Sequence, residues 1–121
     1  MAKILFMEDE PILQKELKEI LEQEKFKIFS AFDGEEGLAM AKKEEPNLIL
    51  LDLILPKKDG FEVLKELKAD EKLKNIPVIV LTNLEGVGDV EKALELGATT
   101  YLVKANYKLE DVVSKVKELL N

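Results

Sequence analysis

Residues 47–60 read NLILLDLILPKKDG, and this stretch decides the fold of the chain. Its four consecutive apolar residues, 48–51, are too few for an ordinary helix but are typical of a strand that is buried on both faces. Asp52 follows this run directly. Because open α/β sheets carry their chemistry at the carboxyl ends of the strands, we expect Asp52 to be a functional residue.

The composition of the 121-residue chain is that of a globular protein, with 46% hydrophobic and 36% charged residues. Its length predicts one domain over residues 1–121. Cys and His are both absent, which excludes disulfides, thiolate metal sites and His-based proton transfer by this chain. No apolar run approaches the length of a membrane span and no signal peptide is evident, so we expect a cytoplasmic protein that does not enter the membrane.

The net charge of the chain limits the kinds of molecule that it can bind. The net charge is −7, and all 18 basic residues are Lys. Nucleic acids repel a negative domain, so we expect no nucleic-acid binding by this domain, but rather a bound cation or a protein partner with a basic face. Without Arg, any phosphate here is met by an ammonium point charge and not by a guanidinium fork.

Short apolar segments alternate with amphipathic segments along the whole chain. The predicted strands are residues 3–7, 26–31, 48–51, 77–81 and 100–103. Each is followed by a predicted helix, and these helices begin near Pro11, Asp33, Asp59, Val90 and Leu109. This order, βα repeated five times, predicts an α/β fold with a doubly wound, parallel five-stranded sheet and helices on both of its faces.

Local signals mark the ends of the predicted helices. Asp33 and Asp59 are each followed three residues later by Glu, which is the pattern of a capping box. Gly97 is predicted to end the fourth helix. Residues 84–88 contain two glycines and a weak helix start, so we expect a mobile loop there.

The first predicted helix has a clear apolar stripe. Its buried face is predicted to contain Ile12, Leu13, Leu17, Ile20 and Leu21. Its outward face is predicted to contain Gln14, Lys15 and Lys18.

Polar side chains stand at the ends of four predicted strands. These residues are Glu8, Asp9, Asp52, Thr82 and Lys104. The carboxyl ends of parallel strands share one edge of a sheet, so three carboxylates, one hydroxyl and one ammonium are expected to converge. Any one of them alone has an ordinary explanation as a cap or a surface charge, but three converging carboxylates repel one another unless a cation lies between them.

An oxygen-rich acidic site of this kind suits Mg²⁺. Asp9 and Asp52 are the expected ligands, with Glu8 as a direct or water-mediated support and the backbone carbonyl of Ile54 as a further oxygen. An ionised carboxylate can itself attack phosphorus, and we expect Asp52 to be that nucleophile. Lys104 and the Thr82 hydroxyl would then stabilise the transferred phosphoryl group.

The whole chain resembles the receiver domains of bacterial two-component response regulators, including the chemotaxis regulators. The matching residues are Glu8, Asp9, Asp52, Pro56, Asp59, Gly60, Thr82, Tyr101 and Lys104. The resemblance implies a flavodoxin-like sheet in the order 2-1-3-4-5. It also implies that Asp52 accepts a phosphoryl group, with Mg²⁺, from a sensor histidine kinase or a histidine phosphotransfer protein, and that no metabolite is turned over.

The same resemblance implies a conformational switch. Thr82 would move toward the phosphoryl group, and Tyr101 would turn from an exposed to a buried position. The surface made by the fourth helix, the fifth strand and the fifth helix would then change its interaction with a downstream protein or a fused effector domain. We expect the unphosphorylated domain to be a monomer, because the Arg-containing ion pairs of dimeric transcription-factor receivers cannot form here.

The chain departs from the receiver pattern in three ways. Ala105 replaces the Pro that usually follows the active-site Lys, so the loop that aims Lys104 is expected to be remodelled. Asn83 replaces a small residue after Thr82 and is expected to crowd the pocket or to form a hydrogen bond in it. Ile54 and Leu84 are apolar and cannot orient an attacking water, which predicts a long-lived phosphoryl group.

Three other functions fit parts of the sequence. The departures at Asn83 and Ala105 also fit a pseudo-receiver, which acts as a protein-interaction module and never accepts phosphate. A flavin or nucleotide binder would share the topology, but its first loop should offer hydroxyls and glycines to a phosphate, whereas residues 8–11 read EDEP. A metal-dependent phosphatase would need a second catalytic acid and a substrate-capping insertion, and neither is evident.

Overall fold

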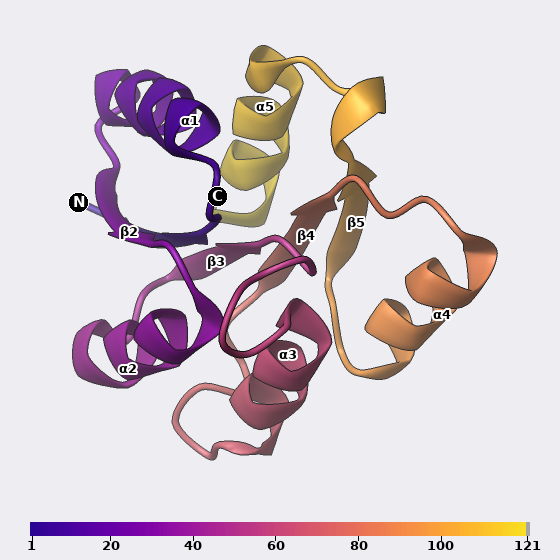
Figure 1. Ribbon diagram of the computed structural model, residues 1–121. Coiled ribbons are helices and arrows are strands. Elements are labelled where there is room, and N and C mark those ends of the chain that lie inside the picture. The colour runs from indigo at the N-terminus through magenta and orange to yellow at the C-terminus, as the bar shows by residue number, and fades with distance from the viewer. Residues whose placement is uncertain (121) are drawn as a thin grey trace.

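The computed structural model describes residues 1–120, and its elements alternate between strand and helix throughout (Figure 1). The strands are β1 (Lys3–Met7), β2 (Lys27–Ala31), β3 (Leu48–Leu51), β4 (Val78–Thr82) and β5 (Thr100–Val103). The helices are α1 (Pro11–Gln23), α2 (Gly34–Glu44), α3 (Gly60–Ala69), α4 (Val87–Glu95) and α5 (Leu109–Leu120), with a 3₁₀ turn, η1 (Lys104–Asn106), between β5 and α5.

The strands form one parallel five-stranded sheet in the order β2-β1-β3-β4-β5. The predicted fold class and strand order are therefore confirmed. At its carboxyl end, β1 is in register with both of its neighbours: Met7 lies opposite Ala31 of β2 and Leu51 of β3. Because β1 and β3 are neighbours in register, the residues that come after these two strands emerge side by side at one edge of the sheet.

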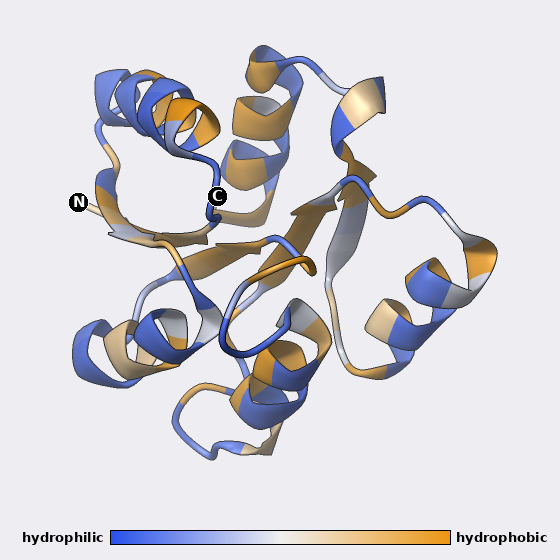
Figure 2. Cartoon of the chain, in the orientation of Figure 1, coloured by the Kyte–Doolittle hydropathy of each residue, from blue (hydrophilic) through white to orange (hydrophobic). Residues whose placement is uncertain are grey.

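Two layers of helices cover the sheet, with α1 and α5 on one face and α2, α3 and α4 on the other (Figure 1). Successive residues of the central strands enter opposite cores, as the two-residue period of a strand requires. In β1, for example, Phe6 packs with Leu17 of α1 and Val116 of α5, whereas Met7 packs on the opposite face. Figure 2 shows these apolar strands between helices whose outward sides are hydrophilic.

The predicted helix caps are present. Asp33 Oδ1 accepts a hydrogen bond from the Glu36 backbone N–H, and Asp59 Oδ1 accepts one from the Glu62 N–H. Gly97 follows the end of α4 with φ of 108°, in the left-handed region that glycine tolerates best. The predicted loop over residues 84–88 was too long, because α4 begins at Val87 with Gly86 as its N-cap and without a side-chain cap.

Two predictions for the surface of α1 were wrong. Ile12, assigned to the buried face, is 66% exposed, and Gln14, assigned to the outward face, is buried with 2% exposure. The helix rests on the sheet through Leu17 and Leu21. Within residues 1–120, no helix is long and apolar enough to cross a membrane.

Candidate functional site

Three acidic side chains meet at the carboxyl edge of the sheet. Glu8 and Asp9 follow β1, and Asp52 follows the neighbouring β3. One carboxylate oxygen from each of the three lies within 4.8 Å of the others. Glu8 and Asp52 are buried and Asp9 is exposed, so the cluster has a buried base and an open side.

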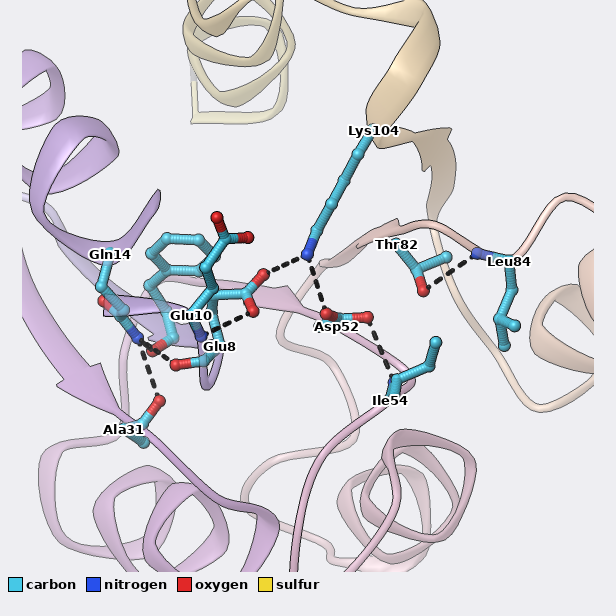
Figure 3. A network of polar contacts seen from close by, with 10 residues as sticks. Glu8, Glu10, Gln14, Ala31, Asp52, Ile54, Thr82, Leu84 and Lys104 are labelled. Carbon is cyan, nitrogen blue, oxygen red and sulfur yellow. Dashed lines mark hydrogen bonds and ion pairs between the residues drawn. The ribbon is translucent and has the colours of Figure 1, made fainter. Parts of the chain in front are cut away.

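Lys104 reaches this cluster from the far side of β4. Its Nζ lies 2.9 Å from Asp52 Oδ2 and 2.6 Å from Glu8 Oε1 (Figure 3). No peptide bond within residues 1–120 is cis, so the Lys104–Ala105 bond is trans. A 3₁₀ turn, η1, begins at Lys104 itself. With a trans bond and Ala105 in place of Pro, the Lys104 ammonium still contacts Asp52.

Hydrogen bonds fix both the backbone and the side chain of Asp52. Its N–H donates to the Met7 carbonyl at 3.0 Å, and its Oδ1 accepts a hydrogen bond from the Ile54 N–H at 3.1 Å. The start of α3 packs tightly beneath it, because a Cβ on Gly60 would lie 2.4 Å from the Asp52 carbonyl oxygen. A side chain at position 60 would push the backbone of Asp52 out of place.

Burial dominates the electrostatics of Glu8. It raises the pKa of this carboxyl from 4.5 to about 7; the bond from Lys104 opposes the rise, and the nearby charge of Asp52 adds to it. Burial also favours neutral Lys104, but its contacts with Glu8 and Asp52 outweigh that effect and raise the pKa of the ammonium. The lysine therefore stays charged beside the two buried carboxyls.

The donor set fits a hard divalent cation. Every side-chain ligand in the cluster is a carboxylate oxygen, which Mg²⁺ prefers. Glu8 Oε1 is buried and faces the Lys104 ammonium at 2.6 Å; because a carboxylate oxygen has two lone pairs, one is left for a metal ion. Asp9 Oδ, Asp52 Oδ and Glu8 Oε would hold the ion, directly or through water. The Ile54 carbonyl remains a predicted ligand.

Thr82 and Tyr101 are joined through the backbone of Leu84. Thr82, buried at the end of β4, accepts a hydrogen bond from the Leu84 N–H at 3.4 Å. The half-buried Tyr101 donates its hydroxyl hydrogen to the Leu84 carbonyl at 2.8 Å. Asn83, which was expected to occupy the pocket, is exposed. A shift of the Thr82 hydroxyl would therefore act on the residue whose carbonyl holds Tyr101.

One polar residue beside the site was missed by the sequence analysis. The amide nitrogen of Gln14 lies within hydrogen-bonding distance of three backbone carbonyls, one of which belongs to Glu8 (Figure 3). Helical periodicity alone places this polar residue outward. The one signal in the sequence is its position five residues after Asp9, in the first turns of a helix that directly follows the acidic pair.

The fold and the site together define a signalling receiver. The chain belongs to the family of response regulator receiver domains, whose family model matches residues 4–117. Receiver domains of this family interact with histidine kinases and effector domains. The five-stranded order and the chemotaxis-like neighbours among solved structures agree with the resemblance found in the sequence.

Individual relatives align with nearly the whole chain. It is 42% identical over 120 residues to the transcriptional regulatory protein CiaR of Streptococcus pneumoniae, and 38% identical over 120 residues to the DNA-binding transcriptional regulator RpaA of Synechocystis. These alignments include 99% of this chain but only 52% and 49% of the relatives, so the chain spans about half the length of these proteins. The Mn²⁺-bound response regulator Rcp1 is similar in structure, with a TM-score of 0.83, 37% identity and coverage of 98% of this chain and 91% of Rcp1.

Proposed function

We propose that residues 1–121 form one receiver domain in which Asp52 accepts a phosphoryl group in a Mg²⁺-dependent reaction. The observation that carries the proposal is the joint position of Asp52, Glu8, Asp9 and Lys104: a buried carboxylate beside two further acids and one ammonium. The similar regulator Rcp1 is known in an Mn²⁺-bound form, which supports the binding of a divalent cation by this chain. Bound Mg²⁺ would supply positive charge to the phosphoryl oxygens.

The chemistry needs no proton transfer at the nucleophile. An ionised Asp52 oxygen attacks the phosphorus of a phosphohistidine on the partner, forming an O–P bond as the P–N bond breaks and the imidazole leaves. The Lys104 ammonium, already 2.9 Å from Asp52, is placed to attract the oxygens of the incoming group. The product is an acyl phosphate on Asp52. The domain turns over no metabolite and so acts as a signal carrier rather than a metabolic enzyme.

The output is a change in the surface formed by α4, β5 and α5. The Thr82 hydroxyl would turn toward the phosphoryl group and release the Leu84 N–H, and the carbonyl of the same residue holds Tyr101 of β5. The donor would be a sensor histidine kinase or histidine phosphotransfer protein, and the recipient a downstream protein or fused effector domain in the cytoplasm. The unphosphorylated domain would be monomeric and would not itself contact nucleic acid.

Phosphorylation by a small donor tests the central step. We expect the wild type, incubated with acetyl phosphate and Mg²⁺, to gain the mass of one phosphoryl group. We expect Asp52→Asn and the wild type in EDTA to gain none. Asp59→Asn is a matched control, because Asp59 is exposed and Asn can still cap α3; this variant should be phosphorylated like the wild type.

The same assay separates this function from the alternatives. A wild type that gains no phosphoryl group at saturating donor and Mg²⁺ would identify a pseudo-receiver that acts by interaction alone. Phosphorylation of Asp52→Asn at the wild-type rate would place the acceptor elsewhere.

A further inference from the structure

Gln14 is an amide side chain buried between α1 and the edge of the sheet that carries the acidic site. It is 2% exposed. Its Nε2 lies 2.9 Å from the Phe6 carbonyl oxygen, 3.0 Å from that of Glu8 and 3.0 Å from that of Ala31. Phe6 and Ala31 belong to strands β1 and β2, whereas Glu8 lies beyond the end of β1 and is part of the acidic cluster.

The orientation of this amide is fixed by its surroundings. Three carbonyl oxygens accept hydrogen bonds but cannot donate them, so only the NH₂ end of the amide can face them. The Gln14 Oε1 atom is buried and has no hydrogen-bond partner among the described residues. A buried acceptor without a hydrogen bond lowers the stability of the fold. The hydrogen bonds of the NH₂ group, and not those of the amide oxygen, therefore hold this side chain in place.

The backbone of Glu8 is thereby held at both of its polar groups. Its N–H donates to the Ala31 carbonyl at 3.0 Å, and its carbonyl accepts from Gln14. The main chain of Gln14 adds a third tie to the acidic segment, because its N–H donates to the Glu10 carbonyl at 3.0 Å. Ala31 of β2 and Gln14 of α1 therefore hold the backbone from Glu8 to Glu10 between them, and the side chain of Gln14 supplies the bond to the Glu8 carbonyl.

We propose that Gln14 is a positioning residue for the divalent cation, one that holds the peptide group between Glu8 and Asp9 so that both carboxylates face Asp52. This inference rests on the proposed Mg²⁺-dependent function. Groups that orient metal ligands typically change metal affinity by tenfold or more when removed. A merely structural role, joining α1 to the sheet, would instead lower stability and leave the affinity of the folded protein for Mg²⁺ unchanged.

Calorimetric titration of Mg²⁺ into the wild type, Gln14→Met and Leu21→Ala tests the proposal. Met keeps the length and the apolar stem of Gln but has no N–H to donate. Leu21 is also on α1 and is fully buried in the core, far along the helix from the acidic segment. We expect Gln14→Met to bind Mg²⁺ about tenfold more weakly and Leu21→Ala, although less stable, to bind with wild-type affinity.

A Gln14→Met protein that is folded and binds Mg²⁺ within twofold of the wild type overturns the inference, as does an equal loss in Leu21→Ala. In both cases the wild type still binds Mg²⁺, so the proposed function is untouched. A wild type that does not bind Mg²⁺ overturns both.

A measurement on the wild type covers the case in which Gln14→Met does not fold. We expect the Gln14 side-chain NH₂ resonances to exchange slowly with water and to shift during a Mg²⁺ titration with the same midpoint as the backbone amide of Asp9. Rapid exchange, or resonances that do not move at saturating Mg²⁺, would contradict the proposal.

Discussion

Lys104 Nζ lies 2.9 Å from Asp52 Oδ2, although the two residues follow strands that are separated by β4 in the sheet. The same ammonium also contacts Glu8, so two buried carboxyl groups share one cation. When no metal is bound, the stability of the folded site therefore depends on the positive charge of Lys104.

We predict that Lys104→Met destabilises the metal-free protein at neutral pH. Leaving a buried carboxylate without its cation costs about 3 kcal/mol, and added Mg²⁺ should restore part of the loss. Urea unfolding in EDTA and in Mg²⁺ measures both quantities. Lys74→Met is the matched control, because Lys74 and its partner Glu71 are both exposed and surface pairs contribute little. Equal losses in the two variants would contradict the prediction.

The stability of the metal-free protein should depend on the ionisation of Glu8. Its pKa is raised to about 7 in the folded state, so the folded protein binds more protons than the unfolded chain between pH 4.5 and 7. The free energy of unfolding should therefore fall as pH rises through this range.

Thermal unfolding in EDTA across this range tests the contribution of Glu8. We expect Glu8→Gln to remove that part of the pH dependence, because the amide does not titrate. Glu10→Gln makes the same change of charge at an exposed position in the same segment, and it should leave the dependence intact. If Glu8→Gln and the wild type have the same pH profile, Glu8 does not titrate in this range.

The lifetime of the phosphoryl group should depend on Ile54. This residue donates its backbone N–H to Asp52, and its side chain is 51% exposed, so it borders the acceptor without offering a polar group. An Asn at this position can orient a water molecule. One net hydrogen bond contributes about 1 kcal/mol, which corresponds to roughly fivefold faster hydrolysis.

Loss of phosphate over time from Ile54→Asn in Mg²⁺ buffer gives this rate directly. Ile12→Asn is the control, since Ile12 is also exposed but lies on α1, and it should keep the wild-type lifetime. A wild-type half-life of seconds would show that apolar side chains at positions 54 and 84 do not protect the acyl phosphate.

Tyr101 should couple the site to the output surface through its hydroxyl. Tyr101→Phe keeps the ring but loses the hydrogen bond to the Leu84 carbonyl, which should lower stability by about 1 kcal/mol. We also expect smaller beryllofluoride-induced shifts of the amide resonances of α4, with shifts near Asp52 retained. Tyr107→Phe, at an exposed position, should behave like the wild type. Full-sized shifts on α4 in Tyr101→Phe would exclude this coupling.

The sequence predicted the central strands well because their apolar runs are short and end in polar residues. Strand β3 matches residues 48–51, and Asp52 and Lys104 could be placed at one edge of the sheet because parallel strands end together. Gln14 was misplaced because the helical period records polarity and not the position of backbone carbonyls, and those of Phe6 and Ala31 come together only when β1 and β2 end beside α1. The start of α4 was missed because Gly86 gives no side-chain cap.

Tyr101 also gives the molecule an optical reporter of its own. The chain has no Trp and two Tyr; of these, Tyr101 is hydrogen-bonded under the loop that precedes α4, and Tyr107 is exposed. Near-ultraviolet circular dichroism depends on fixed side-chain packing, so Tyr101 should dominate the tyrosine signal. Any rearrangement of that loop could then be followed in real time without a dye or an isotope label.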